Sequence, residues 1–477
     1  MRFTLRRAPL ALVLLAACSG GGPGGGYFPM SQEEQEVIQD PGPAAVETEV
    51  QSLPFKHVVW DHRFSKEISR ITLGSAHLYL ETPDHKVVAV DRFTGEAKWE
   101  HHVDTDTPLE WPPVEASGVP EEIRALEVAL VQKNRDIDTM LKTKGPGEET
   151  RKLQKERDQL RDNLVVAQFG DNTYFISAET LYCLVRTTGK MLWTKRLRTF
   201  VPSARPFAIR DYLFVPGADL SRVWALDVKS GKGSEAVFYK TSIGTHDKAI
   251  TNQPVYYSPS LYFVSHDGRV YSYTANGTFR WAYETEDELR ADPVLYPSSI
   301  PYTDERGQPQ QYHVLSLFVG GFDHAFYAVD ATSGGLLWKY ETAGEIKTPA
   351  VAKDSTVYVK TEGGALFAFD ALPMHRNKAG KVEAPRQPNP EWPWKRNGIL
   401  RWKLPMGERF LVKGKETVYV LGPNREIFSM EEMAGQVRGR YPLSTLRLVV
   451  TNPIDDILYV ASPAGYVYAL RESKEKY

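Results

Sequence analysis

Cysteine is scarce in this sequence, which has only Cys18 and Cys183 among 477 residues. Small secreted domains that depend on disulfides need several pairs, so a disulfide framework is excluded. Cys183 lies in the apolar run 181–185, which indicates a small buried side chain rather than a reactive thiol. With 42% hydrophobic and 25% charged residues, the chain has the composition of an ordinary globular protein rather than of a disordered or membrane-embedded one.

An excess of either charge is also missing. The chain carries 58 Lys and Arg residues against 60 Asp and Glu residues, a formal net charge of -2. Removal of residues 1–17, which contain Arg2, Arg6 and Arg7 and no acid, changes the balance to 55 minus 60, or -5. Binding to a phosphate backbone needs clustered positive charge, so we expect no nucleic acid among the partners.

The N-terminus is typical of an export signal. Arginines precede the apolar stretch Ala8–Leu15 and small residues follow it, so residues 1–17 are predicted to be a signal peptide that is removed. The sequence Leu15-Ala16-Ala17-Cys18 resembles the lipobox of bacterial lipoproteins. This resemblance implies cleavage before Cys18 and acylation of Cys18, and Ser19 in the next position implies transfer to the outer membrane.

A glycine-rich stretch follows Cys18. Residues 20–26 read Gly-Gly-Gly-Pro-Gly-Gly-Gly, and an acidic stretch that contains proline continues to about residue 51. Such a composition is typical of a flexible linker, so residues 18–52 are predicted to tether a folded body to a lipid anchor. We therefore expect the protein at the outer membrane, lipid-anchored and facing the periplasm.

The body of the chain, residues 53–477, is a repeat. An alternating apolar strand, a turn with Thr-Gly or Ser-Gly, and a second strand carrying Trp recur with a base period of about 40 residues. This spacing predicts an all-β fold, an eight-bladed β-propeller with four strands in each blade. The recurring tryptophans are interpreted as packing between adjacent blades rather than as a ligand cage. They are Trp60, Trp99, Trp193, Trp281, Trp338 and Trp402.

The last repeat is incomplete, because the sequence stops at Tyr477 before a fourth strand. The segment 55–60 carries a tryptophan of the expected kind, Trp60. We therefore predict that this N-terminal segment supplies the outer strand of the eighth blade. Such a strand closes the ring and leaves no open sheet edge.

The repeated phrase Ala-x-Asp-x-x-Thr/Ser-Gly-x-x-x-Trp, as at 89–99 and 328–338, resembles the pyrroloquinoline-quinone (PQQ)-type propeller repeat. Quinoprotein dehydrogenases share this repeat with the BamB lipoproteins of the outer-membrane β-barrel assembly machinery. The resemblance implies the propeller fold. It leaves two classes of function open, an oxidoreductase with PQQ as its cofactor and a scaffold that binds protein partners.

Several features that the quinoprotein resemblance implies are missing. In that family the quinone lies over a calcium ion, beside an Asp base and against two adjacent cysteines. This sequence has no adjacent cysteines and no Cys-x-x-Cys-His haem motif. Asp91, Asp227, Asp330 and Asp370 recur in turns, where they are expected to accept hydrogen bonds from backbone amides. We predict no catalytic residue, no cofactor and no metal. A PQQ-dependent dehydrogenase and a glycan- or ligand-binding surface propeller stay as alternatives.

Three insertions interrupt the repeats. Residues 119–168 have apolar positions at helical spacing on either side of Gly145-Pro146-Gly147, which predicts an antiparallel helical hairpin. Residues 298–311 form a second insertion, and residues 372–398 form a third. The candidate partner-binding residues in the first and third insertions are Leu126, Leu130, Ile137, Leu153, Leu160, Trp392 and Trp394.

All three insertions fall in connections that leave the same face of a propeller. We interpret this face as a surface selected for contact with other macromolecules. The predicted function is that of a non-catalytic, lipid-anchored scaffold that binds envelope proteins through propeller loops. The resemblance to BamB implies a role in outer-membrane protein assembly.

Overall fold

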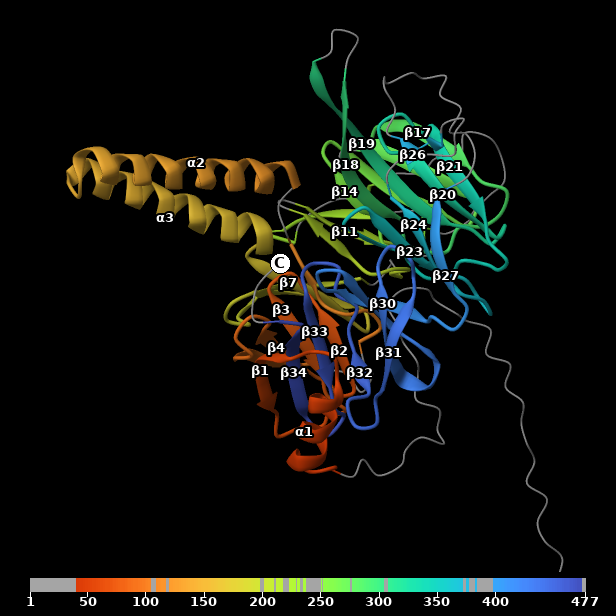
Figure 1. Ribbon diagram of the computed structural model, residues 1–477, viewed down its shortest axis with the longest axis horizontal. Coiled ribbons are helices and arrows are strands. Elements are labelled where there is room, and N and C mark those ends of the chain that lie inside the picture. The colour runs from red at the N-terminus through yellow and green to blue at the C-terminus, as the bar shows by residue number, and fades with distance from the viewer. Residues whose placement is uncertain are drawn as a thin grey trace, which may run out of the picture.

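The computed structural model describes residues 40–473, with gaps at 104–108, 117–119, 198–200, 210–211, 218–222, 229, 232–234, 237–249, 251, 275–276, 304–307, 372–374, 377–381 and 384–397. Within these residues the chain forms eight sheets of four strands, arranged around a ring, and three α-helices (Figure 1). The predicted eight-bladed propeller with an inserted helical element is confirmed.

Each blade is an antiparallel meander whose first strands touch those of neighbouring blades, for example β2 with β32 and β6 with β10. Blades 1 to 4 comprise β2 (Arg70–Leu73), β3 (His77–Glu81), β4 (Lys86–Asp91) and β5 (Ala97–His102); β6 (Val114–Glu115), β7 (Asn172–Ser177), β8 (Thr180–Val185) and β9 (Met191–Arg196); β10 (Phe207–Ile209), β11 (Tyr212–Pro216), β12 (Val223–Asp227) and β13 (Glu235–Ala236); and β14 (Val255–Tyr257), β15 (Ser260–Ser265), β16 (Arg269–Thr274) and β17 (Phe279–Glu284).

Blades 5 to 8 have the same order, except that the fourth strand of blade 8 comes from the N-terminal part of the chain. They comprise β18 (Val294–Thr303), β19 (Pro309–Gly320), β20 (Ala325–Asp330) and β21 (Leu336–Glu341); β22 (Val351–Lys353), β23 (Thr356–Lys360), β24 (Leu366–Asp370) and β27 (Leu400–Leu404); β28 (Arg409–Lys413), β29 (Thr417–Leu421), β30 (Glu426–Glu431) and β31 (Val437–Pro442); and β32 (Leu448–Val449), β33 (Ile457–Ala461), β34 (Tyr466–Arg471) and β1 (His57–Arg63).

The second and third strands of each blade form the core. Consecutive residues such as 78–80 in β3 and 87–90 in β4 are buried, because each sheet is covered on both sides by the adjacent blades. In the fourth strands, exposed and packed side chains alternate, as in β5 and β9. The fourth strands therefore form the rim of the ring, where one edge of each sheet meets water.

The blade tryptophans lock adjacent blades together. Trp60, Trp99 and Trp402 donate their indole Nε1–H to backbone carbonyls in the turn between the third and fourth strands of the next blade, at 2.8, 2.7 and 2.8 Å. Trp193 and Trp281 do the same at 3.2 Å. Each of these five rings also lies over the turn glycine of the next blade, and those glycines are Gly95, Gly189, Gly231, Gly334 and Gly435. Each of these five indoles also packs against an aromatic ring of the second strand of its own blade, as Trp99 does against Tyr79.

Blade 7 lacks such a tryptophan, and the strand register shows what replaces it. Ala89 pairs with Trp99 in blade 1, whereas the equivalent Ser429 of blade 7 pairs with Gly439. The ring of Tyr441, two residues further along β31, lies over Gly439. The register therefore places Gly439 at the tryptophan position of blade 7, with the Tyr441 ring packed over it.

Substitution of a turn glycine tests the tryptophan packing directly. Gly95 and Gly277 both have positive φ angles, +74° and +86°, but an added Cβ would lie 2.6 Å from the Trp60 ring at Gly95 and within 4 Å of nothing at Gly277. Gly277→Ala is expected to lower the free energy of unfolding by about 1–2 kcal/mol, the cost of the backbone conformation alone. Gly95→Ala is expected to cost about 2 kcal/mol more, because the indole is displaced. Denaturant titration of both variants measures the difference, and equal losses would contradict the packing role.

The two ends of the propeller sequence meet in blade 8. Strand β1 pairs antiparallel with β34, from His57 opposite Arg471 to Arg63 opposite Tyr466, with an irregularity between Val58 and Trp60. The predicted closure of the last blade by an N-terminal strand is confirmed.

Helix α1 (Pro43–Ser52) packs over the junction between blades 7 and 8. Val46 and Val50 of the helix are buried with Leu53 and Phe55 among residues of both blades. A tether over 18–52 was expected, but the last 10 residues of that range form this helix. The expectation is wrong for these residues because blades 7 and 8 cover their apolar side chains, which composition alone does not reveal.

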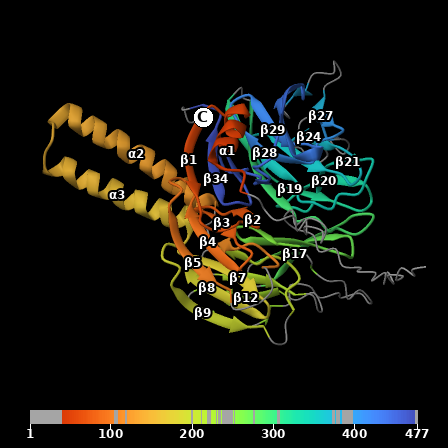
Figure 2. The same cartoon turned by 90° about the horizontal axis from the view of Figure 1, so that it is seen from below.

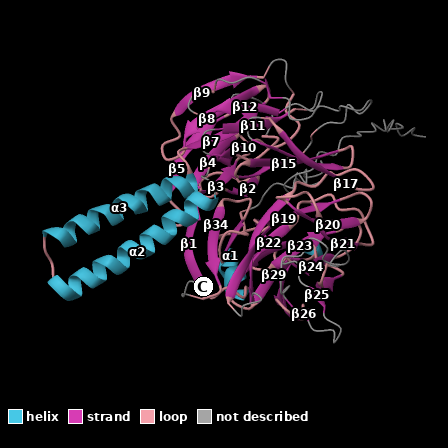
Figure 3. Cartoon of the chain, turned by 90° about the horizontal axis from the view of Figure 1, so that it is seen from above, coloured by secondary structure: helices cyan, strands magenta, loops and turns pink. Residues whose placement is uncertain are grey.

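The insertions project beyond the sheets. Helices α2 (Pro120–Lys144) and α3 (Glu148–Phe169) lie against each other and extend away from the ring (Figures 2 and 3). The expected insertion at 298–311 consists largely of paired extensions of β18 and β19. In the third insertion β25 (His375–Arg376) pairs with β26 (Val382–Glu383). A short 3₁₀ helix spans Pro423–Arg425. None of the helices in the described ranges is long and apolar enough to cross a membrane.

Candidate functional site

All three insertions leave the ring at one face. The helical hairpin and the β18–β19 extension join first to second strands, in blades 2 and 5, and residues 371–399 join the third and fourth strands of blade 6. In an antiparallel meander these two kinds of connection lie at the same ends of the strands. We call this side the hairpin face. The opposite face carries the connections between second and third strands and between successive blades.

Exposed apolar side chains gather at the hairpin face. Those on the helical hairpin, or in turns and strand ends of this face, are Val58, Phe93, Val128, Val131, Leu141, Met191, Leu192, Tyr212, Phe279, Met433 and Ile454. Among the residues that the structure describes, the strongly exposed large apolar residues at the opposite face are Val201 and Met406. Scattered apolar side chains need no explanation, but their concentration on one side is typical of a contact surface.

The apolar residues proposed from the sequence for partner binding lie in the seam of the helical hairpin. Ile137 is buried, with 5% of its surface exposed, and Leu126, Leu130, Leu153 and Leu160 are half-buried. The Lys133 ammonium and the Glu156 carboxylate, 2.9 Å apart, connect the two helices beside this seam. The structure therefore assigns these side chains to pairing of the helices, since the two helices cover each other's apolar sides. Trp392 and Trp394 lie outside the described residues.

The base of the hairpin rests on a buried carboxylate. Glu115, the last residue of β6 before the insertion, accepts hydrogen bonds from Ser75 Oγ at 2.5 Å, from the Ala76 amide at 2.7 Å and from Tyr79 Oη at 2.7 Å. Its other contact is with His77 Nδ1, at 2.8 Å. All four partners belong to blade 1, so this carboxylate joins blades 1 and 2 where the hairpin leaves the ring.

Hydrogen bonding keeps this carboxylate charged. Burial alone would raise the pKa of Glu115, but the hydrogen bonds from His77 and Ser75 outweigh it, and the pKa lies below its usual value. Tyr79 Oη also lies 2.9 Å from Thr173 Oγ1 in β7, on the returning side of the insertion. The hairpin therefore projects from a fixed base.

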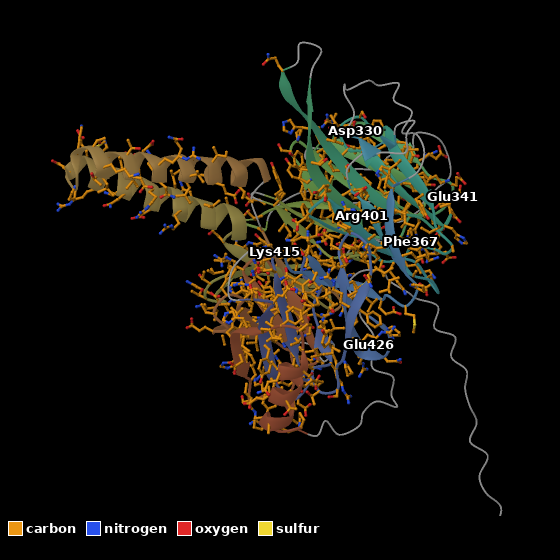
Figure 4. The ribbon with its side chains drawn as sticks, in the orientation of Figure 1. Asp330, Glu341, Phe367, Arg401, Lys415 and Glu426 are labelled. Atoms are coloured by element: carbon orange, nitrogen blue, oxygen red, sulfur yellow. The ribbon has the colours of Figure 1, made fainter. Side chains whose placement is uncertain are left out.

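A second polar cluster joins the two strands that flank the third insertion in sequence. Arg401 Nε, in β27, contacts Asp370 Oδ1 at 2.5 Å across that insertion. Lys413 Nζ joins blade 7 to the same cluster through Glu432 and Asp354, at 2.8 and 2.9 Å. Figure 4 shows Arg401 within the body of the ring, whereas Glu341 at the end of β21 lies at its edge. The helical hairpin and the third insertion thus each begin beside a cluster of hydrogen bonds or ion pairs that joins neighbouring blades.

Three of the four aspartates that recur at the ends of the third strands accept hydrogen bonds from backbone amides of the turns that follow them. The amides of Phe93, Ser230 and Thr332 donate to Asp91, Asp227 and Asp330, at 2.9, 2.8 and 2.8 Å. Asp370 differs from the expectation, because the long insertion follows it and it pairs with Arg401 instead.

In the described ranges, no three His, Cys, Asp or Glu side chains are grouped so that they could hold a metal ion. Cys183 is buried, and this burial raises the pKa of its thiol to about 12. That environment suits a structural side chain.

The fold and the repeats define an eight-bladed propeller of the PQQ-repeat class. The family model described as outer membrane protein assembly factor BamB matches residues 56–232, 152–290 and 267–474. These matches extend over most of the chain, which therefore belongs to the BamB family. No curated protein sequence matches the chain.

Solved structures with the same fold include BamB from Moraxella catarrhalis. That structure is 13% identical with a TM-score of 0.53, and the alignment covers 88% of this chain and 99% of that one. The computationally designed Ika8 protein is 12% identical, with a TM-score of 0.48 and coverage of 86% and 98%. Quinohemoprotein alcohol dehydrogenase ADHIIG from Pseudomonas putida HK5 is 11% identical, with a TM-score of 0.47 and coverage of 88% and 77%. At 13% identity the likeness to the Moraxella catarrhalis structure concerns the fold alone.

Two features of the hairpin face escaped the sequence analysis. The exposed Val128 and Val131 lie outside the seam of the helices, and their spacing of three residues, away from the seam positions, was the available indication. Glu115 lies in a two-residue strand directly before the insertion. Its sequence neighbours give no sign of the buried network, because every partner comes from another blade.

Proposed function

We propose that this protein is a non-catalytic, lipid-anchored scaffold of the bacterial envelope whose hairpin face binds other envelope proteins. The observation that carries the proposal is the coincidence of the projecting insertions and the exposed apolar side chains on one face. Aliphatic surface and projecting helices supply contact energy rather than reaction chemistry. The described strand aspartates, in addition, are engaged in turns or in ion pairs.

A role in outer-membrane protein assembly is the specific form of this proposal. The description of the family, outer membrane protein assembly factor BamB, supports it. The lipobox-like sequence Leu15-Ala16-Ala17-Cys18 supports an outer-membrane location with the propeller in the periplasm. Residues 18–39 of the predicted tether lie outside the described residues, and a linker of their composition between the anchor and helix α1 would allow the ring to stand off the bilayer.

The lipid anchor has a direct test. Metabolic labelling with a fatty acid is expected to mark the wild-type chain and to leave Cys18→Ala unlabelled, because acylation needs the thiol. Equal labelling of both chains would contradict acylation of Cys18. Cys183→Ala is the matched control, and its labelling should equal that of the wild type.

Removal of the hairpin tests the binding proposal. Replacement of Pro120–Ala167 by a short glycine-containing turn is expected to leave the melting temperature nearly unchanged, because helices α2 and α3 cover each other and the closing loop is short. Fewer proteins should then copurify with the chain from detergent-solubilised envelopes. An unchanged set of copurifying proteins would argue against the hairpin as a binding element.

A further inference from the structure

Helix α2 has apolar residues on two opposite sides. One side is the seam, with Leu126, Leu130 and Ile137 facing α3. At about 100° per residue, Val128 lies about 180° and Val131 about 120° from the centre of this seam. Their side chains are 63% and 52% exposed, so neither helix pairing nor the ring covers them.

Helix α3 provides an internal comparison. Its residues opposite the seam, Arg151, Lys155 and Asp158, are exposed and charged, as expected for the outer side of a hairpin. Valine is a poorer helix former than most residues because its χ1 rotation is restricted. Two exposed valines outside the seam of α2 thus serve neither helix formation nor helix pairing, which indicates a surface that is covered by something else.

Charged residues continue the same line along α2. Arg135 and Lys142 follow Val128 and Val131 on the outer side, both are exposed, and neither forms an ion pair within the described residues. Between residues 128 and 142, where the side chains are described, the acid on this line is Asp138, so Arg135 and Lys142 leave this line with a net charge of +1. Lys133 and Lys144, by contrast, already have carboxylate partners, Glu156 and Glu149. We call Val128, Val131, Arg135 and Lys142 the α2 ridge.

We propose that the α2 ridge binds an amphipathic helix of a protein partner, with aliphatic side chains over the two valines and acidic side chains opposite Arg135 and Lys142. This inference rests on the proposed scaffold function and specifies the partner chemistry of the same face. The ridge runs from residue 128 to residue 142, which is 14 steps of about 1.5 Å or about 21 Å, so the partner helix spans at least about four turns. Apolar contact gives the affinity, and the two unpaired cations set the orientation of the partner helix along α2.

Photo-cross-linking distinguishes this surface from the rest of the hairpin. A photoreactive phenylalanine in place of Val128 is compared with the same residue in place of Lys155, in the full chain in isolated envelopes. We expect a cross-linked protein from position 128 with at least about tenfold higher yield than from position 155. The cross-linked peptide, identified by mass spectrometry, should lie in an amphipathic segment with acidic residues. Equal yields, a cross-link to lipid, or a peptide without acids would overturn the proposal.

Charge reversal supplies the second arm. Arg135→Glu with Lys142→Glu is expected to reduce the yield from position 128 at least about fivefold, whereas the matched pair Arg151→Glu with Lys155→Glu on α3 should leave it unchanged. An equal loss in both pairs would overturn the proposal. If hairpin removal reduces copurification while the ridge variants leave the cross-linking yield unchanged, the proposal for the ridge is wrong and the proposed scaffold function stands. If hairpin removal changes nothing either, the binding role of the hairpin fails with it.

Discussion

A chain truncated to begin at Glu67 is expected to lose the cooperative folding of the whole ring. The truncation removes β1, and with it all described pairing of β34 on that side. It also removes the Trp60 indole, which bonds Arg92 O at 2.8 Å and covers Gly95 of blade 1. Blade 8 is then left with an open edge and unpaired backbone groups.

The loss of α1 adds to this effect. The truncation removes four buried side chains from a cluster that joins blades 7 and 8, namely Val46, Val50, Leu53 and Phe55. Blade 7 has no tryptophan in its fourth strand that could hold this junction together. Removal of several fully buried side chains costs about 1.5–3 kcal/mol each. We expect the melting temperature, measured by circular dichroism, to fall by more than about 10 °C or the transition to become non-cooperative.

Two further chains separate the contributions to closure. Deletion of residues 19–39 removes no described contact and should leave the melting temperature unchanged. Glu49→Gln should lower stability by about 1–3 kcal/mol, because Glu49 accepts hydrogen bonds from the Ser444, Thr445 and Leu446 amides. If the chain that begins at Glu67 melted at the wild-type temperature, closure of the ring by β1 would be contradicted.

Glu115→Gln is expected to destabilise the protein by about 3–5 kcal/mol at neutral pH. The carboxylate faces donors from Ser75, Ala76 and Tyr79, and the amide of glutamine would place its own donor against one of them. The surface ion pair of Glu100 with Lys66, 2.8 Å apart, provides the control. Glu100→Gln should cost less than about 1 kcal/mol.

The same variant has a defined pH dependence. The pKa of Glu115 is lower in the folded chain than its ordinary value of 4.5, so the folded state holds this proton less tightly than the unfolded state does. The stabilisation by the charged form is therefore complete above about pH 4.5 and is lost as the pH falls through the lowered folded pKa. Denaturant titrations should show that the difference in free energy of unfolding between the wild type and Glu115→Gln becomes smaller in that pH range. If this difference in free energy of unfolding stayed constant down to about pH 2, the charge of Glu115 would not be the cause of the stabilisation.

The propeller was predictable from the sequence because its determinants are local. The turn phrase that places Asp91, Gly95 and Trp99 recurs in most blades, so each copy confirms the spacing of the others. The closure by β1 was predictable because the last repeat lacks a fourth strand and the segment before the first repeat carries a tryptophan of the repeat type, Trp60. The helical hairpin followed from its apolar period and from its glycine-proline-glycine turn.

The features that sequence reasoning missed depend on residues far apart in the chain. Helix α1 is stabilised by a loop nearly 400 residues away, through Glu49 and residues 444–446. Glu115 is buried only because four partners from blade 1 surround it. In the hairpin, apolar spacing identified the helices but did not show which apolar residues face α3. The exposed fractions assign Ile137 to the seam and Val128 to the surface.

Copurification from detergent-solubilised envelopes tests most directly the claim that the hairpin face is the binding surface. Three tagged chains are compared: the wild type, the chain without Pro120–Ala167, and a chain with Val201→Ser and Met406→Ser on the opposite face. We expect that proteins bound by the wild type are lost from the chain without the hairpin and retained by the opposite-face variant, while all three chains keep similar melting temperatures. Partners retained without the hairpin and lost with the opposite-face substitutions would contradict this claim and place binding on the other side of the ring.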